Sequence, residues 1–300
     1  MNYIKVSEAA KKWGISARRA RLLCAEGKVE GAMQKGKLYF VPENTIKPLD
    51  GRRKKNNTIF EIDYKKEKLA VQRPFTNGEK ERMRDDFIIE FTYDSNAIEG
   101  NSLTLKETSM ALEGLTIDKK PLNDHLDVVG HRDAFLYVQD ISKKNVPLSD
   151  SVIKNIHSLV LMNHPEDKGV FRRIPVKIVG SHIDPIEPNL IESKIFELLD
   201  LDNSRKDVMH DIERIARFHL EFEAIHPFVD GNGRTGRLIM NLQLMNCGYP
   251  PINIKFIDRK RYYRAFDDYY QNGNSNKMVD LFAEYMNERL DEYLAVLTDW

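Results

Sequence analysis

The stretch "HPFVDGNGRTGR", residues 226–237, gathers several chemically active side chains within twelve positions. It contains a histidine that can act as a base, an aspartate that can hold a metal ion, and two arginines three residues apart. The Gly-Asn-Gly step can turn successive backbone N–H groups toward one point and so form an anion nest. A helix that begins near Arg234 would add the positive end of its dipole. Together these groups are the components of phosphoryl-type transfer from a nucleotide.

Each polar side chain of this stretch has an expected role in such a reaction. His226 is expected to titrate near neutral pH and to serve as the base. Asp230 can bind Mg²⁺, which polyphosphates need for charge neutralisation. Arg234 and Arg237 are expected to share one helix face, where each can bind phosphate oxygens in a bidentate manner.

Two other interpretations of the same residues are rejected. Gly231, Gly233 and Gly236 have the G-x-G-x-x-G spacing of dinucleotide-binding sites, but that motif needs a preceding strand. Residues 211–225 repeat apolar side chains at helical spacing instead. His219 and His226 lack the third ligand and the H-E-x-x-H spacing of a zinc site, so His219 is predicted to be an ordinary, partly buried histidine.

The stretch matches in full the signature H-x-F-x-[D/E]-G-N-G-R-x-x-R, and the chain therefore resembles the Fic (filamentation induced by cAMP) family. "GVFRRIPVKIVGSHIDPIEP" resembles the family's pre-flap and flap hairpin, and "FIDRKRYYRAF" its later tyrosine-bearing helix. The resemblance covers most of residues 60–300. It implies a helical fold and the transfer of AMP from ATP to a protein hydroxyl, with release of pyrophosphate.

The resemblance also assigns expected roles residue by residue. His226 would deprotonate a target Ser, Thr or Tyr, and Asp230 would bind the Mg²⁺ that bridges the α- and β-phosphates. Phe228 would be the buried anchor of the loop. The expected nucleotide-binding residues are Gly231, Asn232 (through its amide and its side chain), Gly233, Arg234 for the β-phosphate, Thr235, Gly236, Arg237 for the γ-phosphate, and Tyr263 against the nucleoside. A core position is the competing interpretation for Tyr263.

The expected protein partner is a target whose extended segment pairs with the flap, about Val176 to Pro185, by strand addition. Relatives often form dimers, so a homodimer is a second expected partner state.

"SNAIEGN", residues 95–101, resembles the family's inhibitory motif [S/T]-x-x-x-E-[G/N], with Ser95 and Glu99 in the motif positions. A carboxylate at a helix C-terminus is unfavourable by itself, and Arg237 is the expected compensating cation. The hypothesis is that Glu99 pairs with Arg237 and occupies the place of the γ-phosphate, which restrains transfer. An alternative stays open, since in some relatives this glutamate positions water for removal of AMP.

The first 55 residues form a basic module. They hold fourteen Lys or Arg and five Asp or Glu, a balance of +9, and the other residues carry 32 basic and 41 acidic side chains, a balance of −9. We expect one helix capped by Ser7 and ended by Gly14. A second helix would run from Ser16 to Gly27, and a short strand would be closed by Pro42. The apolar positions of the second helix are predicted to be Ala20, Leu22, Leu23 and Ala25.

"ISARRARLLCAEGKVEGA" within this module resembles the excisionase and MerR-type winged helix-turn-helix families. That resemblance implies a recognition helix opened by Arg18, Arg19 and Arg21, with duplex DNA as the partner. The alternatives are a basic helix that only docks on the body, and a DNA-binding regulator whose Fic body senses nucleotide.

The whole chain reads as mainly α, with one β-hairpin flap in the Fic core and the small N-terminal module. It has 300 residues, of which 41% are apolar and 31% charged, and only two cysteines. No apolar run approaches the ~20 residues of a membrane span and no secretory signal is visible, so we expect a cytoplasmic protein without a membrane partner. The expected domains are residues 1–55 and 56–300, with a linker over residues 49–60. The other expected helices cover residues 79–99, 122–143, 150–163, 188–201, 207–225, 233–247, 258–271 and 276–298, with extended chain over 176–188. A capping box at Thr104 and Glu107 is expected to begin the helix after residues 79–99.

Overall fold

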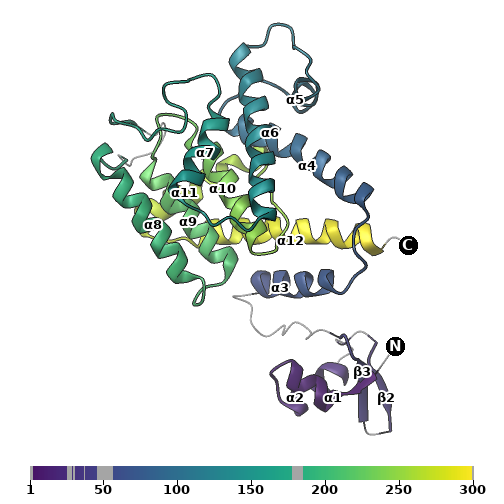
Figure 1. Cartoon of the computed structure of the whole chain (residues 1–300). Helices are drawn as coiled ribbons and strands as arrows, with labels where there is room; N and C mark the ends of the chain where they lie inside the picture. The colour runs from purple at the N-terminus through teal and green to yellow at the C-terminus, as the bar shows by residue number, and fades with distance from the viewer. Residues whose placement is uncertain are drawn as a thin grey trace. The chain divides into compact units, whose positions relative to one another are not determined.

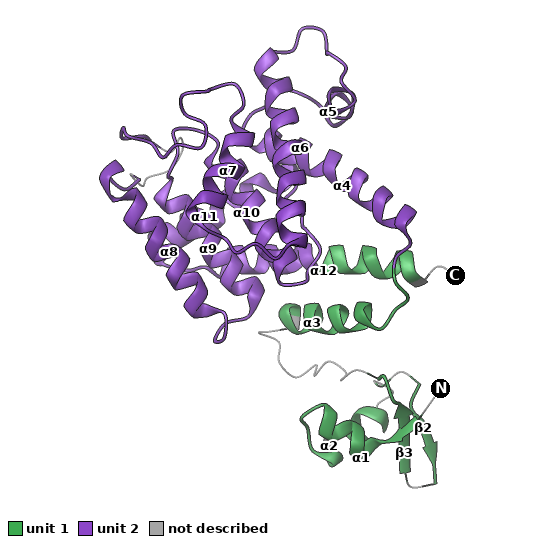
Figure 2. Ribbon diagram, viewed as in Figure 1, with its two compact units in different colours: residues 1–74, 287–300 green, residues 75–286 purple. Residues whose placement is uncertain are grey.

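The computed structural model describes residues 3–25, 29, 31–36, 38–45, 57–177 and 185–298. The described chain is mostly helical (Figure 1) and divides into two compact units (Figure 2). One unit comprises residues 1–74 and 287–300, and the other comprises residues 75–286. No helix in the described part of the chain combines the length and the apolar character needed to cross a membrane.

Helices make up most of the described chain. Those before residue 75 are α1 (Val6–Lys12), α2 (Ala17–Ala25) and α3 (Asn57–Ala70). Those that follow are α4 (Asn77–Ile98), α5 (Leu105–Leu112), α6 (Leu122–Lys143), α7 (Asp150–Val160), η1 (Pro188–Leu190), α8 (Ile191–Arg205), α9 (Asp211–Ile225), α10 (Asn232–Asn246), η2 (Phe256–Asp258), α11 (Arg259–Asn272) and α12 (Asn276–Thr298). The helices predicted over residues 122–143 and 276–298 are present with the predicted bounds.

The N-terminal module combines α1 and α2 with a three-stranded antiparallel sheet. The strands are β1 (Tyr3–Lys5), β2 (Met33–Lys35) and β3 (Leu38–Pro42), in the order β1-β3-β2. Only β3 is predicted from the sequence, because three-residue strands carry too little alternation to be recognised.

Two details of the predicted helices in this module are wrong. The N-cap of α1 is Lys5, and no side chain caps this helix, so Ser7 lies inside its first turn. In α2 the buried residues are Ala20, Leu23 and Cys24, whereas Leu22 and Ala25 are exposed. The buried set repeats at i, i+3 and i+4, which is the spacing of one helix face.

The linker predicted over residues 49–60 ends too late, because α3 already begins at Asn57. The rest of that linker lies outside the described residues, as do Arg19's side chain, Gly27 and the boundary between residues 55 and 56. Most of the predicted flap, residues 178–184, also lies outside them. Within the first unit, α3 is bonded to the end of α12, where Lys65 Nζ lies 2.6 Å from Asp291 Oδ2.

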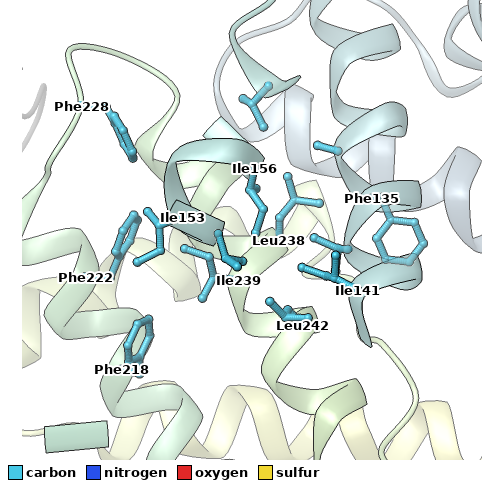
Figure 3. Packing of buried hydrophobic residues seen from close by; sticks show 14 of the residues in the cluster. Phe135, Ile141, Ile153, Ile156, Phe218, Phe222, Phe228, Leu238, Ile239 and Leu242 are labelled. Atoms are coloured by element: carbon cyan, nitrogen blue, oxygen red, sulfur yellow. The ribbon is translucent and has the colours of Figure 1, made fainter. Parts of the chain in front are cut away.

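Helix α10 forms the centre of the larger unit, where it packs against α6, α7 and α9. Its residues are buried almost all round, as expected for a central helix. The core that surrounds it is drawn in Figure 3 and contains large apolar residues from several helices, among them Phe135, Ile141, Ile153, Ile156, Phe218, Phe222, Leu238, Ile239 and Leu242.

Capping interactions and a glycine define both ends of α4 and the start of α5. Thr76 and Glu79 form a capping box at the start of α4. The capping box predicted at Thr104 and Glu107 is confirmed, with Glu107 Oε2 accepting the Thr104 N–H at 2.8 Å. Helix α4 stops at Ile98, where Gly100 adopts a φ of +94°.

The contact between α6 and α7 leads to a prediction about Gly130. A Cβ at this position would collide with the carbonyl oxygen of Leu159, which is backbone and has little freedom to move. Gly130→Ala should therefore lower the free energy of unfolding by about 1–3 kcal/mol. Gly78→Ala is the matched control, since Gly78 is a helical glycine of α4 with open space around it. Alanine there should stabilise by about 0.5 kcal/mol. Equal effects of the two substitutions on thermal unfolding would contradict this packing.

Candidate active site

The reactive stretch forms a tight loop between α9 and α10. His226 ends α9 in the left-handed conformation, with a φ of +49°, and its N–H still donates to the Phe222 carbonyl at 3.1 Å. Gly231 is the N-cap of α10 and has a φ of +73°, which is why glycine is needed there. The chain thus reverses between two helices, so the catalytic candidate His226 and the N-terminus of α10 face one region.

Asn232 holds this loop in shape. Its Oδ1 accepts the Phe228 N–H and its Nδ2 donates to the Phe228 carbonyl, both at 2.9 Å. The side chain is 2% exposed. The Asn232 side chain thus braces the loop, and its expected role in phosphate binding stays a prediction.

A second brace, His157 of α7, is absent from the sequence predictions. Its ring stacks on Phe228 with centroids 3.6 Å apart and an interplanar angle of 4°. Nδ1 accepts the Gly169 N–H at 2.9 Å, so the proton lies on Nε2, which donates to the Asp230 carbonyl at 2.9 Å. Burial lowers the pKa of His157 to about 4, and the neutral ring is the form that makes both bonds. Phe228 is fully buried, as predicted.

The loop opens onto a cavity of about 710 Å³, within the usual range for small-molecule sites. The cavity brings together most of the predicted site residues: Glu99, His226, Asp230, Gly231, Asn232, Gly233, Arg237 and Tyr263. Tyr262 and Phe266 of the predicted tyrosine-bearing helix also line the cavity, whereas the sequence did not indicate Glu223, Asp267 or Tyr270.

Arg234, Thr235 and Gly236 are predicted to bind nucleotide, but they do not line the cavity. Arg234 is 4% exposed, and its Nη1 lies 2.8 Å from Asp127 Oδ1 of α6. Thr235 is fully buried, and Gly236 faces the side chain of Glu223. A helix turns 100° per residue, so the face that carries Arg234 points toward α6 rather than the cavity.

Arg237 reaches the other way, to the end of α4. Its Nε donates to Ser95 Oγ at 2.9 Å, and its Nη2 donates to the Ser95 carbonyl and to Glu99 Oε1, both at 2.7 Å. The Arg237 side chain is 1% exposed. Burial alone would lower its pKa, but the negative charge of Glu99 and the contact with Tyr262 outweigh burial and raise the pKa of the guanidinium. The predicted pairing of Glu99 with Arg237 is thus present in the structure.

The Glu99 carboxylate lies directly against the first turn of α10. A Cβ at Gly233 would collide with Glu99 Oε1, so only glycine permits this approach. The carboxylate therefore occupies the positive end of the α10 dipole, which is the place where a phosphate group would bind.

Burial controls the protonation of the two titratable groups beside this pair. It lowers the pKa of His226 to about 4, with a further contribution from the charge of Arg172. His226 is therefore neutral throughout the neutral range, which revises the expected titration near pH 7 and favours a base. Burial raises the pKa of Glu223 to about 8, with Glu99 as the next cause. Glu223 Oε2 lies 3.8 Å from His226 Nδ1.

Asp230 has the properties of a magnesium ligand. Its side chain lines the cavity and is 66% exposed, so its oxygens can be reached by a hydrated ion. Oδ1 accepts the Gly231 N–H at 2.6 Å and Oδ2 lies 3.6 Å from Arg234 Nη2, which fixes the carboxylate direction. One carboxylate beside an anion site is the usual protein contribution to bound Mg²⁺.

Helix α11 forms the aromatic wall of the cavity. Tyr263 lines the cavity, and its hydroxyl donates to the Ile98 carbonyl at 2.9 Å, which also caps the end of α4. Tyr262 is buried and shares a 2.6 Å hydrogen bond with His219 Nε2. His219 is thus a structural histidine, although it is fully buried rather than partly buried.

The buried histidines lead to a prediction about stability. His157 and His226 have pKa values near 4 in the folded protein, whereas an unfolded histidine has its ordinary value of 6.5. Between these values the unfolded chain binds more protons at these histidines, so each of them lowers the stability as pH falls from 6.5 toward 4. Glu223, with a folded pKa of about 8, contributes in the opposite direction. The slope is about 1.4 kcal/mol per pH unit for each histidine. Thermal unfolding at pH 7 and pH 5 checks this. His157→Asn should flatten the dependence and exposed His164→Asn should not; an unchanged slope in His157→Asn would contradict the argument.

The comparisons with known proteins agree with this geometry. Residues 147–244 match the sequence model of the Fic/DOC family. The chain is similar to "Protein adenylyltransferase Fic" of Drosophila sechellia, with 32% identity over 259 residues, or 85% of this chain and 51% of that protein. The protein of the same name from Nematostella vectensis is 34% identical over 80% of this chain and 56% of its own length. The chain thus spans about half the length of the curated relatives that it matches.

Solved structures show the same fold. A Fic domain-containing signalling protein from Bacteroides thetaiotaomicron aligns with a TM-score of 0.68 and 26% identity, over 80% of this chain and 95% of that one. Fic-1 from C. elegans aligns with a TM-score of 0.70 and 26% identity, over 79% of this chain and 70% of that one. The resemblance predicted from residues 226–237 is thus supported over residues 147–244, which match the Fic/DOC family and contain the reactive loop together with α7 to α9 and most of α10.

Proposed function

We propose that this protein is an adenylyltransferase that transfers AMP from ATP to a hydroxyl side chain of a target protein. One observation carries the proposal: a neutral base, an anion site at a helix N-terminus and an exposed carboxylate surround a single cavity. The base is His226, the anion site begins at Gly231, and the carboxylate is Asp230. The names of the curated relatives support the same chemistry.

In the proposed reaction, His226 accepts the proton of the target hydroxyl. The hydroxyl oxygen then forms a bond to the α-phosphorus, and the bond from that phosphorus to the β-bridging oxygen breaks, which releases pyrophosphate. Backbone N–H groups at the start of α10 hold the phosphates, and Arg237 binds the γ-phosphate once Glu99 has left it. Asp230 would hold Mg²⁺, which neutralises phosphate charge when bound. The flap, residues 176–185, would dock the target segment.

We further propose that Glu99 restrains the enzyme. Its carboxylate pairs with Arg237 and lies against Gly233, so a triphosphate must displace it or bind out of line. Misalignment of about 1 Å can cost about 10²-fold in rate, so restraint does not require exclusion of ATP. Breaking the pair removes the carboxylate from buried Arg237 and leaves its Ser95 bonds in place, and a phosphate can then take the position of the carboxylate.

Glu99→Gly should therefore raise transfer by about 10²-fold. It should also enlarge the gain in thermal midpoint that Mg·ATP produces, since ATP supplies the missing anion. Label transferred from α-labelled ATP to protein, followed by gel and mass spectrometry, measures the rate. His226→Ala should abolish transfer in both backgrounds while nucleotide still raises the thermal midpoint.

The same proteins separate transfer from removal of AMP, the alternative role of Glu99. Labelled Glu99→Gly protein is incubated with unlabelled wild-type protein, and released AMP is measured. Release that depends on Glu99 of the added protein would assign hydrolysis. A Glu99→Gly protein that binds ATP but labels no faster than wild type would disprove the restraint.

We also propose that the N-terminal module is a winged helix-turn-helix that binds duplex DNA. Two helices are followed by the β2–β3 hairpin, and the whole is basic. Arg18 and Arg21 are exposed on α2, where they can reach phosphates or base edges.

Binding of the full chain to a short fluorescent duplex should weaken steeply with salt, with a log–log slope of about −0.9 for each phosphate contact. Arg18→Gln combined with Arg21→Gln should weaken binding and reduce that slope by about 2. Arg82→Gln, at an arginine of α4 whose side chain is 87% exposed, is the control and should change neither. Salt-insensitive binding would indicate a docking module instead.

A further inference from the structure

Arg172 is a buried arginine that bonds to main-chain carbonyl groups. It follows α7 in the chain and is 3% exposed. Its guanidinium donates to four carbonyl oxygens: Nε to His226 at 2.8 Å, Nη1 to Ile174 at 3.1 Å, and Nη2 to Ile186 at 2.5 Å and to Ile225 at 3.5 Å. Its own N–H donates to the Pro227 carbonyl at 2.9 Å.

These carbonyls come from two parts of the site. Ile225 and His226 lie at the C-terminus of α9, where carbonyl groups lack intrahelical partners and a positive charge is stabilising. Ile174 precedes the flap segment 176–185 and Ile186 follows it. The planar guanidinium of Arg172 thus joins the residues on both sides of the flap segment to the backbone of His226.

The opposite side of the loop has separate supports. Asn232 is bonded to Phe228, and His157 is bonded to the Asp230 carbonyl. Neither bond involves Arg172. The nucleotide side of the loop and its target side are therefore held by different residues, and a substitution can disturb one without the other.

We propose that Arg172 is a positioning residue that holds the backbone of His226 in register with the chain on both sides of the flap segment, so that the imidazole meets the target hydroxyl. This inference rests on the proposed transferase function and specifies how its protein substrate is placed. An error of about 1 Å between hydroxyl and base can cost about 10²-fold in rate. Arginine is needed because its three nitrogens can bond to His226, Ile174 and Ile186 at once, whereas the single side-chain nitrogen of lysine cannot reach all three carbonyls.

The test uses the full chain in the Glu99→Gly background, with Arg172→Gln, Arg172→Lys and the control Arg173→Gln, whose parent side chain is exposed. At saturating Mg·ATP, Arg172→Gln should lower the rate of label transfer by about 10²-fold, and Arg172→Lys should restore part of it. The affinity for the Mg²⁺ complex of a non-hydrolysable ATP analogue should stay within about threefold in all variants, because Arg172 is not expected to contact the nucleotide.

Hydrogen–deuterium exchange gives a readout that does not need activity. Arg172→Gln should increase exchange in residues 170–177, 185–190 and 222–228 together, and Arg173→Gln in none of them. A parent protein that labels nothing would disprove the proposed function, and exchange would then still decide whether Arg172 joins the segments. An unchanged transfer rate, a loss of nucleotide affinity equal to the loss of rate, or faster exchange at only one segment would overturn the proposal.

Discussion

A buried arginine joins the two helices on which the site depends. Arg237 of α10 is 1% exposed, and its partners, Ser95 and Glu99, come from the end of α4. A buried guanidinium without partners would lower the stability of the fold by several kcal/mol. The end of α4 must therefore lie where Ser95 and Glu99 can bond to Arg237. Glu99 in turn lies at an unfavourable helix end and needs the cation. The same pair that stabilises the packing of α4 on α10 thereby places a carboxylate at the anion site.

The reactive loop is held in shape by hydrogen bonds and stacking with buried side chains of the protein. Asn232 uses both polar atoms on Phe228, and His157 stacks on the Phe228 ring while bonding to the Asp230 carbonyl. Arg172 holds the opposite end of the loop. With these bonds made inside the protein, the backbone at the start of α10 is already held in place, and such preorganisation is the condition for electrostatic catalysis.

Burial shifts the two groups beside the ion pair in opposite directions and leaves both neutral near pH 7. It lowers the pKa of His226 to about 4 and raises that of Glu223 to about 8. The charge of the inner cavity is then dominated by Arg237 and Glu99, which cancel one another. Buried Arg237 needs an anionic partner, and in the proposed reaction a phosphate takes the place of the Glu99 carboxylate.

The sequence by itself determined the features that depend on near neighbours in the chain. These include the extents of α6 and α12, the capping box at Thr104, the turn at Gly231 and the composition of residues 226–237. Tertiary structure decided which partner each side chain meets. Arg234 and Arg237 are equivalent in spacing, yet α6 holds one away from the cavity and α4 holds the other inside it. His157 lies 73 residues from its partner Asp230, and no local periodicity encodes such a pair. Burial likewise depends on the whole fold, which is why the pKa of His226 could not be read from its neighbours in sequence.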